Sequence, residues 1–467
     1  MKKVIVVGGG ISGLTTAWLL RDAVKSQGLS VTIRLLEQAH VTGGKIKSTD
    51  ENGFVCEWGP NGFLDSKPQT LDLCRAMGID NALMRSNDKA RKRFVFSDGS
   101  LHQLPHDAIS FVGSNLLSLG GKIRLMAEPF AKAAPVGDES LAAFGRRRLG
   151  DEALRKLIAP MASGIFAGDP EQMSLRSCFP RIAELEAQYG GLIKAMIALA
   201  GKKRKEKHAG KVSSSAAGPG GVLTSFRPGI QYLSDMLAEQ LGSIVETGVT
   251  IVNAQQGEEG WVLVDDGGQK YDADIVVFAV PAYEAARILT AIDATIADIL
   301  ASIPYSPLKV VCFGYESIGL EHDLDGFGYL VPKEEKRTVL GTLWDSSMFE
   351  NRAPEGRVLV RSMVGGACRP ELAHLSPQEI ERLVALDLKE IMGITKSPCF
   401  VKVIDHPQAI PHYTIGHGER VQRIAERLAV LPNLHLTGNA FKGVGINDCV
   451  AASQEMVHRV CSSLTKL

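Results

Sequence analysis

Residues 4–13, with the sequence VIVVGGGISG, decide the fold of this chain. The first four residues are all apolar and β-branched, which is typical of a central parallel strand. The pattern from Leu14 to Ala23 predicts a helix, and residues 31–36, VTIRLL, predict a second strand. Together these segments predict one βαβ unit.

The glycines between the first strand and the helix fit the spacing G-x-G-x-x-G. In this context Gly8 permits a tight turn, Gly10 lets the backbone approach a pyrophosphate, and Gly13 allows close packing of helix on strand. The helix N-terminus then offers free N–H groups and a positive dipole end to the phosphates. A structural glycine-rich turn is the alternative.

An acidic residue and a glycine pair extend this motif. Glu37 follows Gly13 by 24 residues and ends the second strand, where a carboxylate can bind ribose hydroxyls and repel the 2′-phosphate of NADP. Residues 41–48, VTGGKIKS, resemble the GG motif of flavoenzymes of the amine oxidase superfamily. Since no second G-x-G-x-x-G has a strand and helix around it, an oxidase is favoured over an NAD(P)H-dependent reductase.

Composition excludes several classes of function. The 467 residues predict two or three lobes, and 52 basic against 52 acidic residues give no charge pattern for nucleic acid. Eight scattered cysteines without a C-x-x-C pair predict neither disulfides nor a metal site, which fits a reducing cytosol. No apolar stretch approaches the ~20 residues of a spanning helix, and the first residues read as a strand, not a signal peptide.

The fold class expected is α/β, with a discontinuous Rossmann-like domain, a mixed-sheet substrate domain and an inserted helical lobe. The nucleotide domain is expected at residues 1–75, 222–282 and 430–467, and the substrate domain at 76–97 and 283–429. The helical lobe is expected at 98–212. Its basic and small-residue end, 202–222, predicts an exposed loop.

Five further segments carry a family resemblance: residues 56–63 (CEWGPNGF), 163–169 (SGIFAGD), 325–332 (DGFGYLVP), 410–417 (IPHYTIGH) and 443–449 (GVGINDC). With the motifs above, they make the chain resemble flavin-dependent protoporphyrinogen oxidases, which are closely related to bacterial coproporphyrinogen III oxidases. The resemblance runs nearly end to end. The segments SGIFAGD and DGFGYLVP separate this family from amine oxidases of the same fold.

The resemblance implies a noncovalent FAD and names the residues that hold it. They are Gly8, Gly9, Gly10, Ile11, Ser12, Gly13, Glu37, Gly44, Trp58, Gly59, Pro60, Asn61, Ile251, Val444, Gly445 and Ile446. The position of His406 is a tryptophan beside the flavin in some relatives, which leaves a flavin contact of His406 open.

The resemblance also implies a substrate pocket. Arg93 matches an arginine that meets a propionate, and the carbonyl of Gly164, the catalytic group, matches one that orients pyrrole N–H donors. Phe327, Leu330 and Met363 match apolar residues that clamp the macrocycle. Without the resemblance, the three apolar residues read as core and Arg93 as a surface charge.

The implied reaction is the six-electron oxidation of protoporphyrinogen IX to protoporphyrin IX in haem biosynthesis, with oxygen or another electron acceptor. With oxygen, three equivalents of hydrogen peroxide form. A hydride passes from a methylene bridge to the flavin, and no strong side-chain base is needed. Three alternatives stay open: coproporphyrinogen III oxidation, an amine oxidase, and a non-catalytic FAD protein. Further cations beside Arg93, such as Arg91 and Lys92, would favour the first alternative.

The expected location is the cytoplasm. By resemblance, the helical lobe docks peripherally on the cytoplasmic face of the inner membrane, and residues 108–119 are apolar enough to bind lipid shallowly. Burial of that segment inside the protein explains it equally well. The expected partners are a porphyrinogen and an electron acceptor. Binding of nucleic acid or a metal is not expected, and whether the protein forms a homodimer stays open.

Overall fold

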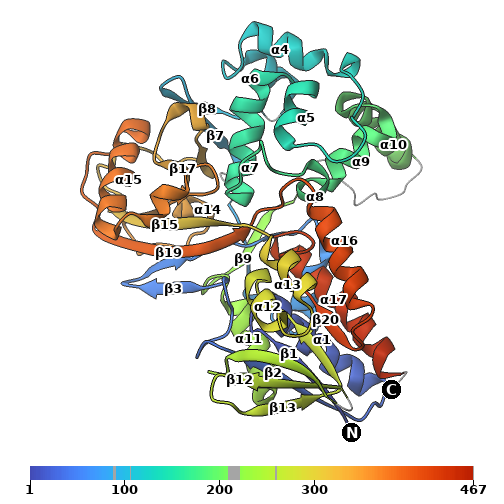
Figure 1. The fold of residues 1–467 in the computed structure, drawn as a ribbon. Helices are drawn as coiled ribbons and strands as arrows, with labels where there is room; N and C mark the ends of the chain where they lie inside the picture. Colours follow the sequence, from blue (N-terminus) through green and yellow to red (C-terminus); the bar gives the residue numbers. More distant parts are fainter. Residues whose placement is uncertain (88–90, 106, 209–220, 258–259, 466–467) are drawn as a thin grey trace.

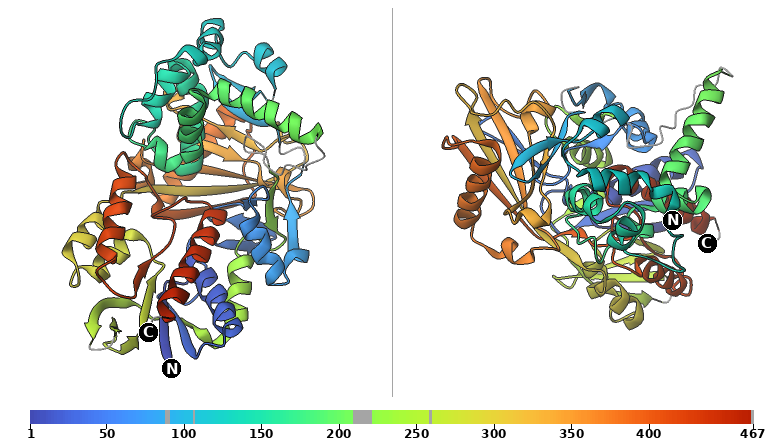
Figure 2. Two further views of the ribbon diagram at one scale, coloured as in Figure 1. Left: turned by 90° about the vertical axis from the view of Figure 1, so that its right-hand side faces the viewer. Right: turned by 90° about the horizontal axis from the view of Figure 1, so that it is seen from above.

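The computed structural model describes residues 1–87, 91–105, 107–208, 221–257 and 260–465. The chain forms three regions: an α/β region that contains both termini, a region built on a long-stranded sheet, and a helical lobe (Figure 1). The two termini lie close together at the end of the molecule away from the helical lobe (Figure 2).

The α/β region is organised around a five-stranded parallel sheet. Its order is β10-β2-β1-β14-β20, with bounds Val245–Thr247, Val31–Glu37, Lys2–Val7, Ile275–Phe278 and Leu434–Leu436. β1 is central and its apolar residues 4–7 are buried. The predicted strands at 4–7 and 31–36 are therefore confirmed, as is the return of the chain to this sheet after a long insertion.

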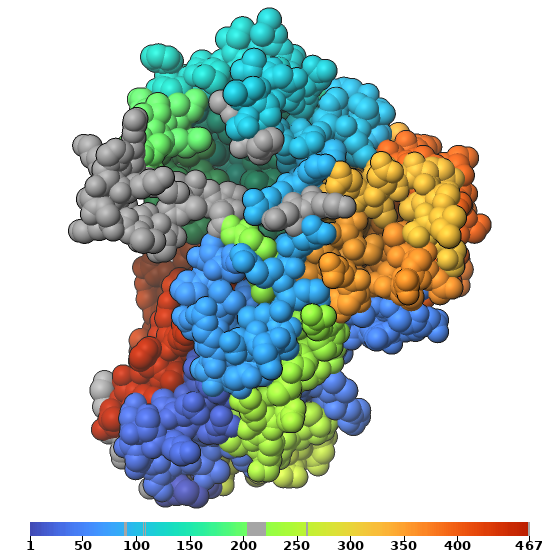
Figure 3. Space-filling model, turned by 180° about the vertical axis from the view of Figure 1, so that it is seen from behind, coloured from blue at the N-terminus to red at the C-terminus, as the bar shows by residue number. Residues whose placement is uncertain are grey.

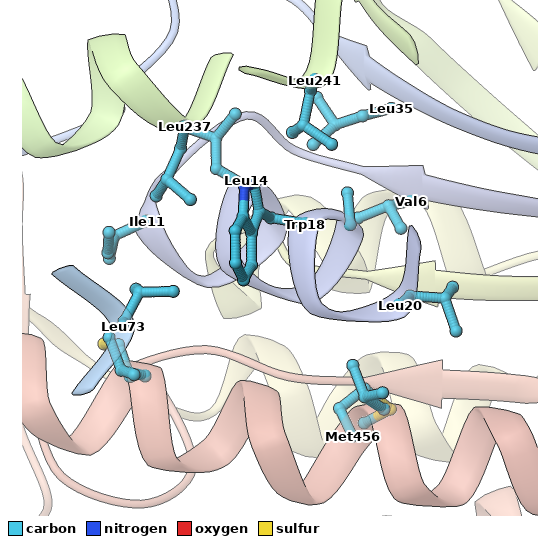
Figure 4. Packing of buried hydrophobic residues seen from close by; sticks show 14 of the residues in the cluster. Val6, Ile11, Leu14, Trp18, Leu20, Leu35, Leu73, Leu237, Leu241 and Met456 are labelled. Atoms are coloured by element: carbon cyan, nitrogen blue, oxygen red, sulfur yellow. The ribbon is translucent and has the colours of Figure 1, made fainter. Parts of the chain in front are cut away.

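Three helices cover one face of this sheet. They are α1 (Ile11–Ser26), α11 (Tyr232–Leu241) and α17 (Ile446–Leu464). Leu14 and Trp18 of α1 pack between Leu237 of α11 and Met456 of α17 (Figure 4). α1 begins three residues earlier than predicted, because Gly10 takes the N-cap position.

The opposite face is covered by a small antiparallel sheet and three helices. The sheet holds β11 (Ile251–Gly257), β12 (Gly260–Asp265) and β13 (Lys270–Ala273). The helices are α12 (Ala282–Leu289), α13 (Ala294–Ala301) and α16 (His417–Leu428). Ala285, Ile296 and Ile424 from these helices share a core cluster with Ile5 of β1. Assigning residues 283–301 and 417–428 to the substrate domain was therefore wrong.

The second region is a seven-stranded mixed sheet with the order β19-β15-β18-β17-β16-β7-β8. Its strands run Phe400–Pro411, Tyr305–Glu316, Arg357–Gly365, Val339–Leu343, Gly328–Leu330, Arg93–Ser97 and Ser100–Gln103. Only β16 and β7 pair in parallel. One face packs on α15 (Pro377–Met392).

Two small sheets lie between the regions. β3 (Ser48–Glu51) and β4 (Phe54–Glu57) form a hairpin whose Phe54 and Cys56 pack on the seven-stranded sheet. β5 (Phe63–Leu64), β9 (Leu223–Phe226) and β6 (Leu83–Arg85) form a small sheet. Leu83, expected in the substrate domain, packs on the core around α1, where α2 (Pro68–Ala76) also lies.

The helical lobe contains α3 to α10. Their bounds are Ala108–Gly113, Leu119–Met126, Leu141–Arg148, Asp151–Ala153, Ala159–Phe166, Leu175–Cys178, Pro180–Tyr189 and Leu192–His208, with a π-helical turn at Leu154–Ile158. The lobe starts after β8, so its expected boundary at 98 was wrong. The prediction of an exposed loop at 202–222 was wrong for residues 202–208, because they are helical. Residues 209–220 lie outside the described residues. No helix among the described residues is long and apolar enough to cross a membrane.

Candidate active site

The geometry of the glycines at the N-terminus of α1 is compatible with the three roles that the sequence predicts. Gly8 has a φ of +107°, and a Cβ on Gly13 would lie 1.9 Å from the carbonyl oxygen of Gly8. A Cβ on Gly10 would meet no atom within 4 Å, so open space lies beside this glycine. The N–H groups of Ile11, Ser12 and Gly13 lie in the first turn, where a helix has no internal acceptor for them. This combination fits a diphosphate.

Glu37 and the Gly43-Gly44 pair surround the same loop. The Glu37 carboxylate accepts hydrogen bonds from the N–H groups of Gly9 and Ala39, at 2.5 and 2.8 Å. The Gly43 N–H donates to the Gly9 carbonyl at 2.8 Å, and a Cβ on Gly44 would lie 3.3 Å from the Cα of Gly10. The two glycine motifs and the acid therefore meet at one place, although 28 residues separate Gly9 from Glu37.

Residues 58–61 lie between the α/β region and the seven-stranded sheet. The N–H of Trp58 donates to the Lys47 carbonyl at 2.8 Å, and Trp58 packs, as Met363 does, against the core cluster that contains Leu359. His406 Nε2 lies 2.9 Å from the carbonyl oxygen of Trp58, and burial lowers the pKa of His406. Gly59 and Pro60 continue this segment to Asn61, whose amide donates to a buried carboxylate. Trp58 and His406 are thus neighbours.

Two of the expected cofactor residues are core residues. The side chains of Ile251 and Ile446 are 3% and 5% exposed and belong to the core clusters on opposite faces of the parallel sheet. A cofactor at these positions would therefore meet mainly main-chain atoms. Gly445 is the N-cap of α17, and Val444 packs against the core of the helical lobe.

The expected substrate residues lie on one face of the seven-stranded sheet. Phe94, Tyr329 and Val364 point into the core beneath α15. Because side chains alternate along a strand, Arg93, Leu330 and Met363 lie on the opposite face. The cross-strand pairs connect them: Arg93 pairs with Gly328, and both Leu330 and Met363 pair with Gly341.

Contacts bring the remaining two substrate residues to this face. The guanidinium of Arg93 lies over the Phe327 ring, 4.9 Å from its centroid. Gly164, in α7, lies against Leu330, since a Cβ on Gly164 would come within 2.7 Å of Leu330 Cδ2. Gly164 is in the last helical turn, where carbonyl groups have no internal donor. The structure therefore brings all five predicted residues together. The surface of the molecule is hollowed below the helical lobe (Figure 3).

Sequence reasoning missed the charged residues beneath this face. Arg361 and Asp345 form an ion pair of 2.9 Å, and both are 1% exposed. The signal in the sequence was an arginine at an inward position of the apolar strand RVLVRSMV. Lys45, next to Gly44, was also missed: its ammonium donates to the Ala409 carbonyl at 2.5 Å, and burial lowers its pKa to about 8.

A cavity of about 360 Å³ lies elsewhere, at the edge of the seven-stranded sheet. Lys92, Phe94 and Trp344 line it together with acidic residues at 321, 323 and 325. Phe94 faces the core beneath α15, on the side of the sheet away from Leu330 and Met363. This cavity is thus separate from the predicted substrate residues.

The fold and the site define a flavin-dependent oxidoreductase. The sequence matches the family "Flavin containing amine oxidoreductase" over residues 11–461. Solved structures of lower identity share the fold, among them a reduced UDP-galactopyranose mutase with a TM-score of 0.73 and 15% identity, covering 99% of this chain and 96% of that one.

Relatives of higher identity narrow this class. A coproporphyrinogen III oxidase of Bacillus subtilis is 30% identical, with 96% of both chains covered. A chloroplastic protoporphyrinogen oxidase of Nicotiana tabacum is also 30% identical, covering 99% of this chain and 86% of the relative. A solved structure from Exiguobacterium sp. 255-15, provisionally named a protoporphyrinogen oxidase, has a TM-score of 0.84 at 26% identity over 98% of both chains. The chain belongs to the flavin-containing amine oxidoreductases, within the protoporphyrinogen and coproporphyrinogen oxidase family, and is an FAD-dependent oxidase.

Proposed function

We propose that this protein oxidises protoporphyrinogen IX to protoporphyrin IX in three two-electron steps, with oxygen as the acceptor and hydrogen peroxide as the second product. One observation carries the proposal. Gly164, Leu330, Met363 and the Arg93–Phe327 pair converge on one face of a sheet that also contacts Trp58. This combination of apolar walls and one cation suits a large apolar ring with carboxylate groups.

A bound FAD would supply the hydride-accepting group for each two-electron oxidation. The residues of this chain orient the macrocycle. The Arg93 guanidinium, held over Phe327, binds a propionate, and Leu330 and Met363 contact the ring. The Gly164 carbonyl accepts a pyrrole N–H and so orients the methylene bridge next to it. The protons released from the substrate pass to solvent, and the proposed mechanism requires no side-chain acid or base among the predicted substrate residues.

Coproporphyrinogen III carries two more propionates and would require further cations. Lys92, adjacent to Arg93, forms an ion pair with Asp325, which competes with a second propionate for the Lys92 ammonium. It also lines the cavity at the edge of the sheet, away from Leu330. This pairing favours protoporphyrinogen over coproporphyrinogen as the substrate.

The test is aerobic turnover of protoporphyrinogen IX and coproporphyrinogen III side by side, followed by porphyrin fluorescence and peroxide release. Arg93→Ala should raise KM at least about tenfold, because it removes a charge-assisted hydrogen bond. Lys92→Ala is the matched control and should change KM little. Faster turnover of coproporphyrinogen would replace the proposed substrate, and no turnover of either would overturn porphyrinogen oxidation.

We also propose that the helical lobe contacts the cytoplasmic face of a membrane. Around α3 and α4 large apolar side chains are exposed: Ile109, Val112, Leu119, Ile123, Met126 and Phe130, between 61% and 91%. Such a cluster of exposed apolar side chains suits shallow insertion into a lipid surface. Ile123→Asp with Phe130→Asp should abolish co-sedimentation with anionic phospholipid vesicles. Equal binding by this variant would contradict the contact.

A further inference from the structure

Arg361 connects the predicted cofactor segment to the predicted substrate face. Its Nη1 donates to two carbonyl oxygens of that segment, Glu57 at 2.9 Å and Gly59 at 2.8 Å. Its Nε donates to the Asp345 carboxylate at 2.9 Å. One guanidinium therefore fixes the main chain on both sides of Trp58.

The position of Arg361 in β18 determines which face it serves. Leu359, Arg361 and Met363 alternate with residues of the core beneath α15, so they point to the face that carries the substrate residues. Met363 is two positions along the same strand. A displacement of Arg361 would thus move the cofactor segment relative to the strand that contacts the substrate.

The partners of Arg361 are themselves held from several elements. Asp345, at the start of α14 (Asp345–Met348), also accepts a hydrogen bond from the Asn61 amide at 3.1 Å. The Glu57 carboxylate pairs with Arg352 at 3.0 Å and accepts the N–H of Ile230 at 3.0 Å. All four charged side chains are at most 1% exposed. The segment is therefore fixed at both of its ends by buried charges.

Arg361 bonds protein groups through Nε and Nη1, while its Nη2 is buried without a hydrogen-bond partner among the described residues. Because it is 1% exposed, a ligand cannot reach its guanidinium. It is thus neither a catalytic residue nor a cofactor ligand. A buried arginine of this kind costs free energy unless its charge is paired, and a fork of several donors can hold carbonyl groups in fixed positions.

We propose that Arg361, together with Asp345, is a positioning residue that holds residues 57–61 against the flavin and in register with Met363. This inference rests on the proposed role of residues 58–61 in holding FAD. Arg361 and Asp345 lie outside the sequence motifs described above. In this proposal, their buried ion pair in the substrate sheet sets the geometry of the cofactor segment.

Arg361→Lys tests the proposal in the full FAD-loaded enzyme. Lysine keeps the charge beside Asp345, but its single ammonium cannot bond both carbonyls and the carboxylate in the same geometry. We expect the FAD dissociation constant to rise about tenfold, the visible circular dichroism of the flavin to change, and kcat to fall. Asp345→Asn, which weakens the other half of the pair, should change the same flavin spectrum if the first variant does not fold.

Arg148→Lys is the matched control. Arg148 is also 1% exposed, pairs with Glu186 and donates to the Gly190 carbonyl, but it lies in the helical lobe. It should lower thermal stability and leave the flavin spectrum unchanged. A folded Arg361→Lys enzyme with an unchanged FAD dissociation constant and flavin spectrum would overturn the proposal.

Gly59→Val separates this inference from the proposed function. A Cβ on Gly59 would lie 3.0 Å from the Lys45 carbonyl oxygen, so the substitution moves the cofactor segment directly. If Gly59→Val leaves FAD binding unchanged, residues 58–61 do not hold the cofactor and that part of the proposed function fails. If Gly59→Val weakens FAD binding while Arg361→Lys does not, only the positioning role fails.

Discussion

Gly164 and Leu330 lie in direct contact across the boundary between the helical lobe and the seven-stranded sheet, with only 2.7 Å between an added Cβ on Gly164 and Leu330 Cδ2. A side chain at 164 would displace the end of Leu330. Since that end is flexible, the fold can adapt, but the space between the two residues narrows. The contact therefore offers a way to change the substrate site without unfolding the protein.

For Gly164→Ala we expect kcat/KM for protoporphyrinogen to fall about tenfold or more, because a shift of the macrocycle by about 1 Å strongly affects hydride transfer. Alanine stabilises a helix by about 1 kcal/mol relative to glycine, so the thermal midpoint should not fall. Steady-state kinetics and thermal unfolding measure the two effects. The double variant Gly164→Ala with Leu330→Ala should recover part of the rate, and a single variant with wild-type kinetics would remove Gly164 from the substrate site.

The glycines of the loop at the N-terminus of α1 should respond in opposite ways to the same substitution. Gly13→Ala places a Cβ 1.9 Å from a backbone oxygen, so we expect a loss of several kcal/mol of stability or no folded protein. Gly10→Ala meets nothing within 4 Å, so the apoprotein should unfold at the wild-type temperature while FAD binds more weakly. Thermal unfolding of apoprotein and FAD titration distinguish them, and normal FAD affinity in Gly10→Ala would show that the diphosphate lies elsewhere.

Local signals made parts of the fold predictable from the sequence. The bounds of α15 could be predicted because Ser376 and Glu379 form a capping box, Pro377 takes the first helical position and Gly393 ends the helix with a φ of +72°. The βαβ unit was predictable for the same reason, since its strand, glycines and Glu37 are close in sequence.

Long-range packing was not predictable in this way. The amphipathic pattern of α12 and α13 shows that they pack on a sheet, but not on which one, and the structure places them on the parallel sheet. The β7–β8 hairpin was missed although Asp98 and Gly99 both have positive φ, the geometry that Asp-Gly favours in tight hairpin turns. Arg361 was missed because its partners Glu57 and Gly59 are about 300 residues away, at separations of 304 and 302.

The buried pair of Glu57 and Arg352 should contribute far more to stability than an exposed pair. Glu57→Gln leaves Arg352 charged at 1% exposure, which typically costs about 3 to 5 kcal/mol. Asp72→Asn, which breaks the exposed pair with Arg75, should cost less than about 1 kcal/mol. Urea unfolding of the two variants compares their stabilities directly. Equal urea midpoints would mean that water or a proton at the Glu57 site compensates for the lost ion pair.

His417 should make the protein less stable in mild acid. Its ring is 2% exposed and stacks on Tyr413 with a centroid distance of 4.0 Å, and burial lowers its pKa to about 4. The main chain of Phe441 opposes this shift of the pKa, Arg420 lowers the pKa further, and Asp138 raises it. In the unfolded chain the pKa is near the ordinary value of about 6.5, so the unfolded state takes up a proton that the folded state resists.

The stability that neutral His417 contributes is therefore complete above about pH 6.5 and is lost as the pH falls toward about 4, by about 3 kcal/mol in total. His417→Phe keeps the stacking on Tyr413 and removes the titration. Urea unfolding at about pH 7 and about pH 5 should show a smaller loss of stability for this variant than for the wild type. An equal loss in both proteins would mean that the buried His417 ring is protonated in the folded state or exposed to water.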